Sequence, residues 1–274
     1  MSSRLPLFTR GIADSQSQEN DPSSPAEQRD DAKRNFLKTM RALPTQHYWN
    51  VYFDRQAKEG ESGDQYHSGL EQLGTQIESV QDFWRYANNT PVGNIGVRES
   101  LYLFKSGFRP VWEDRRNILG GSWTFRFPKS IGPDVWTRVQ LLAIGEKLQS
   151  VLDDGTNSDH NGRTCANFYS DDQLCGVGLS VRFNSHLITV WHRDASKKNS
   201  IDNIVKCIME ELPPEMQPKP DAYYYKRHSD HAGFNPPPEL KVVLDSRRQE
   251  EEKLAAAAAK GGDAKPAVTV ESPQ

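Results

Sequence analysis

The sequence has few cysteines and no long apolar segment, and both absences limit the class of protein. Three cysteines, Cys165, Cys175 and Cys207, lie far apart in 274 residues, which fits a reduced intracellular protein better than a disulfide framework or a zinc knuckle. No apolar run is long enough to span a membrane, and Arg4 and Arg10 interrupt the one candidate signal region. We therefore expect a cytoplasmic protein with no membrane contact.

Excess positive charge and catalytic motifs are also lacking. The formal net charge of -3 argues against a broad basic surface that binds nucleic acid along its backbone, so any such contact should be local. The sequence has no Cys–His pair, metal-spaced histidine cluster or phosphate-cradling glycine loop. Glu113 and Asp114 are adjacent acids, which seldom form an acid–base pair on a loop. We predict a protein that is not an enzyme and has no catalytic residues, metal or cofactor.

The apolar content of 35% is low for a compact chain and indicates polar tails around a smaller folded part. We expect residues 1–40 to be disordered, apart from a short basic helix near 33–40. Residues 41–233 should form the folded domain, and residues 234–274 a disordered or transiently helical tail that does not pack. The polar stretch 153–172 is long for a loop, and we interpret it as an insertion.

Alternation of apolar and polar side chains predicts six or seven short strands with one apolar face each. For example, Trp123, Phe125 and Phe127 alternate with Ser122 and Thr124, a pattern typical of antiparallel sheets and unlike the continuous apolar runs of parallel ones. The expected fold class is α+β, with a curved antiparallel sheet and about three helices packed on its convex face. The concave face would stay open, which suits a platform for a nucleobase.

Three helices are expected between these strands. Ser79 followed by Asp82 resembles a capping box with Asp in place of Glu. Pro133 suits the first turn of a helix that should continue to Leu152. Ser200 should cap a third helix, and the Pro-Pro pair that follows residue 212 should end it.

The stretch Pro110-Val111-Trp112-Glu113-Asp114 combines a large aromatic with two acids. A charged neighbour makes Trp112 a poor core residue, although a partly buried Trp with a solvated Glu is a simple alternative. On a loop, an indole face can stack on a flat ring, and a carboxylate can accept hydrogen bonds from the edge of that ring. A carboxylate would select guanine, whose edge presents two parallel donors, and such a pair contributes about 1–3 kcal/mol.

Several ordered motifs carry a resemblance to a known family. The motifs are Asp82-Phe83-Trp84, Leu103-Phe104-Lys105, Trp112-Glu113-Asp114, Gly120-Gly121-Ser122-Trp123, Leu141-Leu142-Ala143-Ile144-Gly145-Glu146, Cys175-Gly176-Val177, Val181-Arg182, Trp191 and the stretch 225–230. With these motifs in order over residues 43–233, the chain resembles the eukaryotic translation initiation factor 4E family, the messenger-RNA cap-binding proteins.

The resemblance implies binding of the 7-methylguanosine cap of mRNA in a slot on the concave side. It implies that Tyr66 and Trp112 sandwich the methylated base and that Glu113 reads its Watson–Crick edge. It further implies that Arg182 contacts the phosphate bridge and that Trp191 lies against the methyl group. Methylation leaves a positive charge on the ring, which two electron-rich faces favour over plain guanine.

The resemblance also implies a role in regulating translation initiation through protein partners. Pro44, Val80, Trp84 and Leu141 fall where the family binds a Tyr-x-x-x-x-Leu-hydrophobic helix, which the scaffold factor 4G or 4E-binding proteins supply. The alternative for Trp84 is an ordinary core residue. We expect a monomer.

Departures from the family pattern keep a second role open. Tyr66 stands where the main initiation factors carry Trp, which resembles the 4E homologous proteins linked to repression. Trp49, in contrast, is kept at a position where that second class usually has a different aromatic. Ser122, Asn184 and Leu187 replace expected basic residues, so we expect weaker cap binding with a shallow salt dependence. The alternative function is a cap-competing repressor or a specialised isoform that does not recruit 4G. The basic residues left for the phosphates are Arg182 and, as further candidates, Arg115, Arg116 and Lys129.

Overall fold

The computed structural model describes residues 28–34, 42–55, 69–152 and 172–261. The chain divides into two units, Met1–Ala42 and Leu43–Gln274. In the first unit residues 28–34 are helical, and most of the basic helix expected near 33–40 lies outside the described residues. Within the described ranges, no helix combines the length and the apolar character that a membrane crossing requires.

One antiparallel sheet of seven strands dominates the second unit, with the strand order β2-β1-β3-β5-β6-β4-β7. Sequence alternation predicted six of these strands. The strands are β1 (Pro44–Asp54), β2 (Leu70–Ser79), β3 (Ser100–Lys105), β4 (Gly121–Pro128), β5 (Leu174–Val181), β6 (Ser185–His192) and β7 (Tyr223–Arg227).

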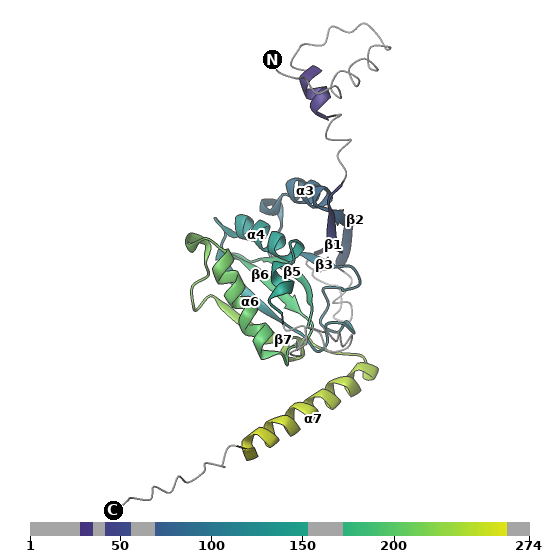
Figure 1. The fold of residues 1–274 in the computed structure, drawn as a ribbon, viewed down its shortest axis with the longest axis vertical. Helices are drawn as coiled ribbons and strands as arrows, with labels where there is room; N and C mark the ends of the chain where they lie inside the picture. Colours follow the sequence, from purple (N-terminus) through teal and green to yellow (C-terminus); the bar gives the residue numbers. More distant parts are fainter. Residues whose placement is uncertain (1–27, 35–41, 56–68, 153–171, 262–274) are drawn as a thin grey trace, which may run out of the picture. The chain divides into compact units, whose positions relative to one another are not determined.

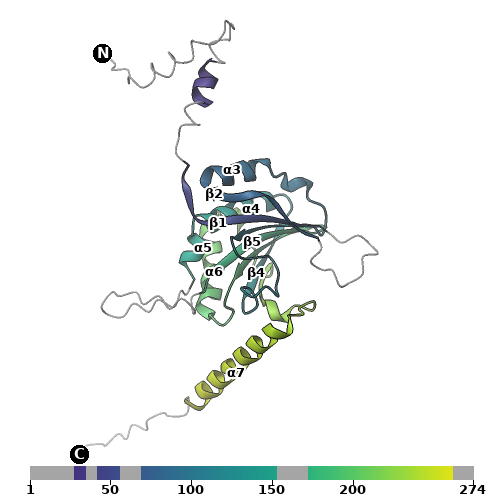
Figure 2. The ribbon, with the colours of Figure 1, turned by 90° about the vertical axis from the view of Figure 1, so that its right-hand side faces the viewer.

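Helices lie mainly on one face of this sheet, as Figures 1 and 2 show for α4, α5 and α6. The α-helices are α3 (Val80–Asn89), α4 (Gly132–Ile144), α5 (Lys147–Ser150), α6 (Lys198–Glu211) and α7 (Pro238–Gly261). Short 3-10 turns are η2 (Val92–Asn94), η3 (Pro214–Met216) and η4 (His228–Asp230).

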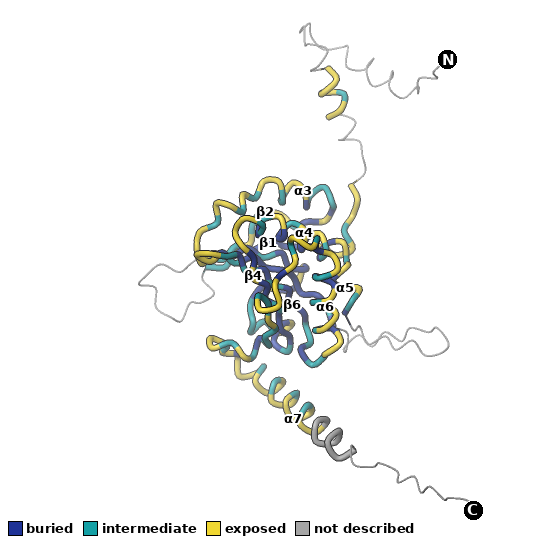
Figure 3. Tube along the Cα trace, turned by 90° about the vertical axis from the view of Figure 1, so that its left-hand side faces the viewer, coloured by how far each residue is buried: buried dark blue, intermediate teal, exposed yellow. Residues whose placement is uncertain are grey.

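The main core lies between the sheet and these helices. Apolar side chains from five central strands meet Trp136 and Val139 of α4 and Ile204 and Ile208 of α6, and Figure 3 shows the sheet as the most buried part of the chain. Each such side chain stabilises the fold by about 1.5–3 kcal/mol. The predicted fold class, an α+β protein with a curved antiparallel sheet, is therefore confirmed.

A smaller aromatic cluster covers part of the other face. Its buried members are Tyr52, Phe104, Phe108, Cys175 and Trp191. Glycines on β5 make room for these rings, because a Cβ at Gly178 would lie 2.6 Å from the ring of Tyr102 on β3. The concave face therefore combines broad aromatic surfaces with a shallow floor.

The predicted start of α3 is confirmed, with Ser79 as its N-cap. The Ser79 hydroxyl oxygen accepts a hydrogen bond from the Asp82 backbone N–H at 3.1 Å, and the hydroxyl group donates to Asp82 Oδ2 at 2.6 Å. This cap fixes the start of α3 directly after β2, so that the helix turns back over the sheet edge.

The second and third predicted helices differ from expectation. The helix expected from Pro133 to Leu152 ends at Ile144, because Glu146 adopts a left-handed conformation with φ of 60° and starts the separate helix α5. Ser200 does not cap the third helix, which begins at Lys198. Ser200 lies in its first turn and is fully buried.

Sequence alternation missed β2 and most of α7. β2 is an edge strand with mostly exposed or half-buried side chains, so it carries no one-sided apolar signal. In the C-terminal region, where we expected no packing, α7 begins at Pro238 and its side chains form ion pairs with the domain. Arg247 lies 3.2 Å from Asp194, and Glu251 lies 2.9 Å from Arg227.

Candidate functional site

Trp112 and Glu113 lie on the loop between β3 and β4, and hydrogen bonds hold this loop in shape. The fully buried Asn117 side chain donates to the carbonyl oxygens of Arg109 at 2.5 Å and Val111 at 2.9 Å. The indole and the carboxylate are therefore presented from a preorganised backbone, which reduces the entropy that a ligand must remove.

Trp112 lines a cavity of about 470 Å³ on the concave face. The strand register places five residues in one row across the sheet, each paired with the next. They are Tyr102 on β3, Gly178 on β5, Thr189 on β6, Thr124 on β4 and Tyr224 on β7. All five line the cavity. Two tyrosines thus flank a row of small residues, which leaves space for a flat ligand across the sheet.

Three of the predicted cap-binding residues, Trp112, Arg182 and Trp191, line this one cavity. Glu113 follows Trp112 on the same loop, and Tyr66 lies outside the described residues. Trp191 is only 5% exposed, and the ring of His228 covers one of its faces at a centroid distance of 4.3 Å. The five residues keep their assigned roles as predictions.

Sequence reasoning missed two arginines at one end of the cavity. Arg55 and Arg98 line it together with Arg182. The end of β1, the start of β3 and the end of β5 meet at this edge, where Asp54 pairs with Ser100 and Ser100 with Ser180. Knowledge of the strand order would have revealed the cluster, because each arginine flanks one of these strand ends.

Arg116, one of the further basic candidates for the phosphate site, is held by its own loop. Arg116 donates to the Gly107 carbonyl oxygen at 2.6 Å and lies 5.5 Å from the centroid of Phe108, so its own loop holds it. Ser122 and Leu187 line the cavity and bring no charge to it. Positive charge is therefore concentrated at the arginine end.

The indole of Trp112 is stacked on a histidine that sequence reasoning did not select. The rings of Trp112 and His231 are nearly parallel, with centroids 4.0 Å apart and an interplanar angle of 10°. Four residues later, the backbone N–H of Asn235 donates to Glu113 Oε1 at 3.0 Å. These contacts join parts of the chain more than a hundred residues apart, and no local pattern in the sequence predicts them.

Burial controls the charge of the two nearby histidines. It lowers the pKa of His231, with a further lowering by Lys226 that Asp230 and Glu113 oppose. It also lowers the pKa of the fully buried His228 well below the ordinary value, helped by His192 and His231. Both imidazoles are therefore expected to be neutral near neutral pH.

A buried polar network fixes the end of β7, from which this histidine segment leaves. His192 Nδ1 lies 2.7 Å from Asp172 Oδ2, and His192 Nε2 lies 2.7 Å from the Tyr225 hydroxyl. Burial raises the pKa of Tyr225. Asp172 and His192 are fully buried, so the carboxylate and the imidazole of this arrangement have no surface that a substrate could reach.

The predicted partner-binding residues lie at the start of β1 and on α3 and α4. Pro44 pairs with Ser79, which directly precedes Val80, and Trp84 stands one turn further along α3. Trp84 is 39% exposed and Leu141 is 38% exposed. Trp84 is therefore not the ordinary core residue of the alternative interpretation, and both side chains offer apolar surface to solvent.

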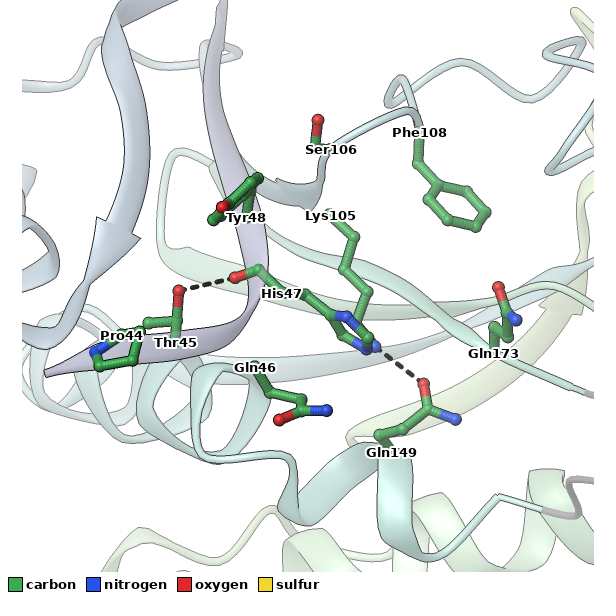
Figure 4. A pocket seen from close by; sticks show the side chains of 10 residues that line it. All are labelled: Pro44, Thr45, Gln46, His47, Tyr48, Lys105, Ser106, Phe108, Gln149 and Gln173. Atoms are coloured by element: carbon green, nitrogen blue, oxygen red, sulfur yellow. Dashed lines mark hydrogen bonds between the residues drawn. The ribbon is translucent and has the colours of Figure 1, made fainter.

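A second cavity, of about 640 Å³, lies beside the first half of β1 (Figure 4). The buried Lys105 ammonium group donates to Gln149 Oε1 at 2.9 Å and lies 3.6 Å from Glu146. Burial lowers the pKa of Lys105, and Glu146 raises it in opposition. The positive charge is thus already compensated from within. Among the described residues, no group of three potential ligands could hold a metal ion.

Sequence comparisons point to one family. The family model described as Eukaryotic initiation factor 4E matches residues 44–241. The protein named Eukaryotic translation initiation factor NCBP from Oryza sativa subsp. japonica is 28% identical over 204 residues, covering 72% of this chain and 80% of that relative. Eukaryotic translation initiation factor 4E-4 from Caenorhabditis elegans is 28% identical over 158 residues, covering 56% and 62%.

Solved structures show the same fold. A complex of C. elegans eIF4E-3 with the 4E-binding protein Mextli and cap analog has a TM-score of 0.55 at 21% identity, covering 69% of this chain and 95% of that chain. A complex of Ascaris suum eIF4E-3 with m2,2,7G cap has a TM-score of 0.53 at 22% identity, covering 72% and 97%.

Proposed function

The chain belongs to the eukaryotic initiation factor 4E family, and on that premise we propose that it binds the 7-methylguanosine cap of mRNA and regulates translation initiation. The observation that carries the proposal is the pairing of Glu113 with Trp112, which lines the concave cavity, on a loop held by the Asn117 side chain. The relatives are named as translation initiation factors, and similar folds were solved with cap compounds.

Stacking would supply most of the affinity. One face of Trp112 would contact the methylated base, and Tyr66 would contact the opposite side of that base. Each base–aromatic contact contributes about 1–3 kcal/mol, and the positive charge on the methylated ring adds about 2 kcal/mol in a dry slot. The cation–π contribution makes the slot bind 7-methylguanine more tightly than guanine, because only the methylated ring carries the charge.

Glu113 would select the base, and the arginine end of the cavity would hold the phosphates. The carboxylate accepts N–H donors, as its bond to the Asn235 backbone N–H already illustrates. Arg55, Arg98 and Arg182 line the far end, and a guanidinium matches the geometry of phosphate oxygens. We therefore expect Arg55 and Arg98 to contact the phosphate bridge together with Arg182.

A binding role fits the titratable groups better than catalysis does. The buried network of Asp172, His192 and Tyr225 is the most enzyme-like arrangement among the described residues, and its acid and imidazole have no exposed surface. On the helix side, the exposed Trp84 and Leu141 suit a partner with a Tyr-x-x-x-x-Leu-hydrophobic helix, whose apolar side chains would cover them. The scaffold factor 4G and 4E-binding proteins are the expected partners.

A cap-competing repressor is the second candidate function. It is favoured by Ser122 and Leu187, which line the cavity without charge where the family resemblance expects basic side chains. A repressor would bind the cap and a 4E-binding helix but not the 4G helix, so parallel titrations with both peptides distinguish the two roles.

Fluorescence titration of the full chain with 7-methyl-GTP and with GTP tests the proposed function. We expect strong quenching and high affinity for the methylated nucleotide, weak binding of GTP, and loss of both signals in Trp112→Ala. Trp84→Ala is the matched control, because it removes an exposed indole from the helix side and should leave the affinity unchanged. An equal response of the wild type to both nucleotides would refute cap binding.

A further inference from the structure

We infer that residues 231–235 act as an internal ligand of the Trp112–Glu113 slot, closing it in the free protein and competing with the bound base. This inference rests on the proposed function, because it assigns a regulation to the same site. It explains why two contacts of one short segment fall on the two side chains that should recognise the cap.

The first contact covers one face of Trp112, inside the cavity that Trp112 and His231 both line. The imidazole of His231 lies parallel to the indole with centroids 4.0 Å apart, which is direct stacking contact. A base inserted between them would need about 7–8 Å, since each pair of carbon surfaces is separated by about 3.5–4.0 Å. A base and His231 therefore cannot share this face of Trp112, and one must leave when the other binds.

The second contact occupies the carboxylate. Asn235 N–H donates to Glu113 Oε1 at 3.0 Å, as the edge of a guanine would do from its ring N–H. The side chain of Asn235 takes no part in this bond, so the donor is the backbone itself. One short segment thus supplies both an aromatic ring for the indole and an N–H donor for the acid.

The segment is held near the slot at its start. His228 N–H donates to the Gly120 carbonyl oxygen at 3.0 Å, and the hydrogen bond of Phe234 N–H to the His231 carbonyl oxygen at 3.0 Å closes a turn. The compact turn brings Gly233 to the edge of the indole, because a Cβ there would lie 3.8 Å from Trp112.

The far end of the segment is tethered by α7. Arg247 contacts Asp194 at 3.2 Å and donates to the Ser196 hydroxyl at 2.6 Å, and Arg227 contacts Glu251 at 2.9 Å. A short tether at both ends gives the internal ligand a high effective concentration, so it returns to the slot whenever the slot is empty.

The middle of the segment is exposed. Ala232 and Gly233 face solvent, so the turn can move away without opening the main core. A competing ligand with a cationic ring and phosphates makes contacts that the segment lacks, notably with the arginine end of the cavity. Cap binding would therefore displace the segment. The apparent affinity would equal the intrinsic affinity multiplied by the fraction of molecules that are open.

Matched variants of the full chain test the competition with 7-methyl-GTP. We expect His231→Ala to bind about tenfold more tightly, because one stacking contact of the closed state is lost. Asn235→Pro removes the backbone donor and should bind several-fold more tightly, whereas Asn235→Ala keeps the N–H and should match the wild type. Equal or weaker binding by His231→Ala would overturn the inference, and weaker binding would make His231 part of the cap site instead.

A measurement without nucleotide separates this inference from the proposed function. In the free wild-type chain, the ring current of Trp112 should shift the NMR signals of the His231 ring protons upfield, and Trp112→Ala should remove the shift. Unshifted signals in the wild type would overturn the inference whatever the cap affinity. A clear shift together with no 7-methyl-GTP binding by any variant would instead refute the proposed function and leave the closed contact intact.

Discussion

The two sides of the sheet present their tryptophans differently. On the helix side, Trp84 is 39% exposed and its ring is tilted against that of Phe83, with centroids 5.2 Å apart and an angle of 59°. On the concave side, Trp112 lies parallel to His231 at 4.0 Å. The helix side therefore offers a surface that a partner can use at once, whereas the concave slot must first release a segment of its own chain.

The difference also lies in how each tryptophan is supported. Trp84 stands on a helix whose first turn is capped by the Ser79 side chain, and Trp112 stands on a loop held by the buried Asn117 side chain. Both supports are rigid, so the regulation of the slot depends on the segment that covers it. Ligand binding on the concave side is therefore controlled by access to the slot and not by the shape of the site.

Exchanging the two tryptophans for alanine should give the largest effects and separate the sides completely. Trp112→Ala should weaken 7-methyl-GTP binding more than about 100-fold, because it removes stacking and cation–π terms together. Trp84→Ala should weaken binding of a Tyr-x-x-x-x-Leu-hydrophobic peptide by a similar factor. Calorimetric titration of both variants with both ligands measures this, and loss of both affinities in one variant would show that the sides are coupled.

Glu113→Gln should have the next largest effect, confined to the concave side. The amide places an NH₂ donor against the donors of guanine, so 7-methyl-GTP binding should fall about tenfold to 100-fold, equivalent to about 1–3 kcal/mol. The peptide affinity should not change. Calorimetry with 7-methyl-GTP and with the peptide checks both statements, and an unaltered nucleotide affinity would remove Glu113 from the recognition scheme.

Neutralising the arginine end should have a moderate effect that depends on salt. Arg98→Ser and Arg182→Ser should each weaken 7-methyl-GTP binding several-fold in low salt and should flatten its dependence on NaCl. Arg126→Ser is a control, because this exposed arginine does not line the cavity. Salt slopes equal to that of the wild type would show that these side chains do not contact the phosphates.

Lowering the pH should have the smallest effect and should act on the concave side alone. His231 faces Glu113, Lys226, Asp230 and His228, and closure lowers its pKa, mainly by burial. The closed state therefore binds fewer protons, is fully stable above the ordinary pKa of about 6.5 and weakens as the pH falls below it. Nucleotide affinity of the wild type should rise relative to that of His231→Ala between pH 7.5 and 5.5, and a constant ratio would contradict this.

Much of the fold could be predicted from side-chain periodicity, and the failures have physical causes. The strand that contains Trp123 and Phe125 alternates apolar with polar side chains and was recognisable, whereas β2 at the edge of the sheet buries too little to show a period. The break before Glu146 was missed because apolar spacing continues past Gly145, although a glycine at that position is the C-cap that ends α4.

The site was predictable only where neighbours in the sequence carry the chemistry. Trp112 and Glu113 are adjacent, so their combination was visible before the fold was known. Arg55 and Arg98 join Arg182 only through the strand order. The contacts of the segment that contains His231 depend on the path of the chain after β7, which no periodicity encodes.

The most direct test of the account is a nuclear Overhauser measurement on the full chain saturated with 7-methyl-GTP. We predict cross-peaks between the N7-methyl protons and the indole protons of Trp112, together with loss of those between His231 and Trp112. Methyl cross-peaks to residues of the cavity beside Lys105, or persistence of the His231–Trp112 contact in the bound state, would contradict the account.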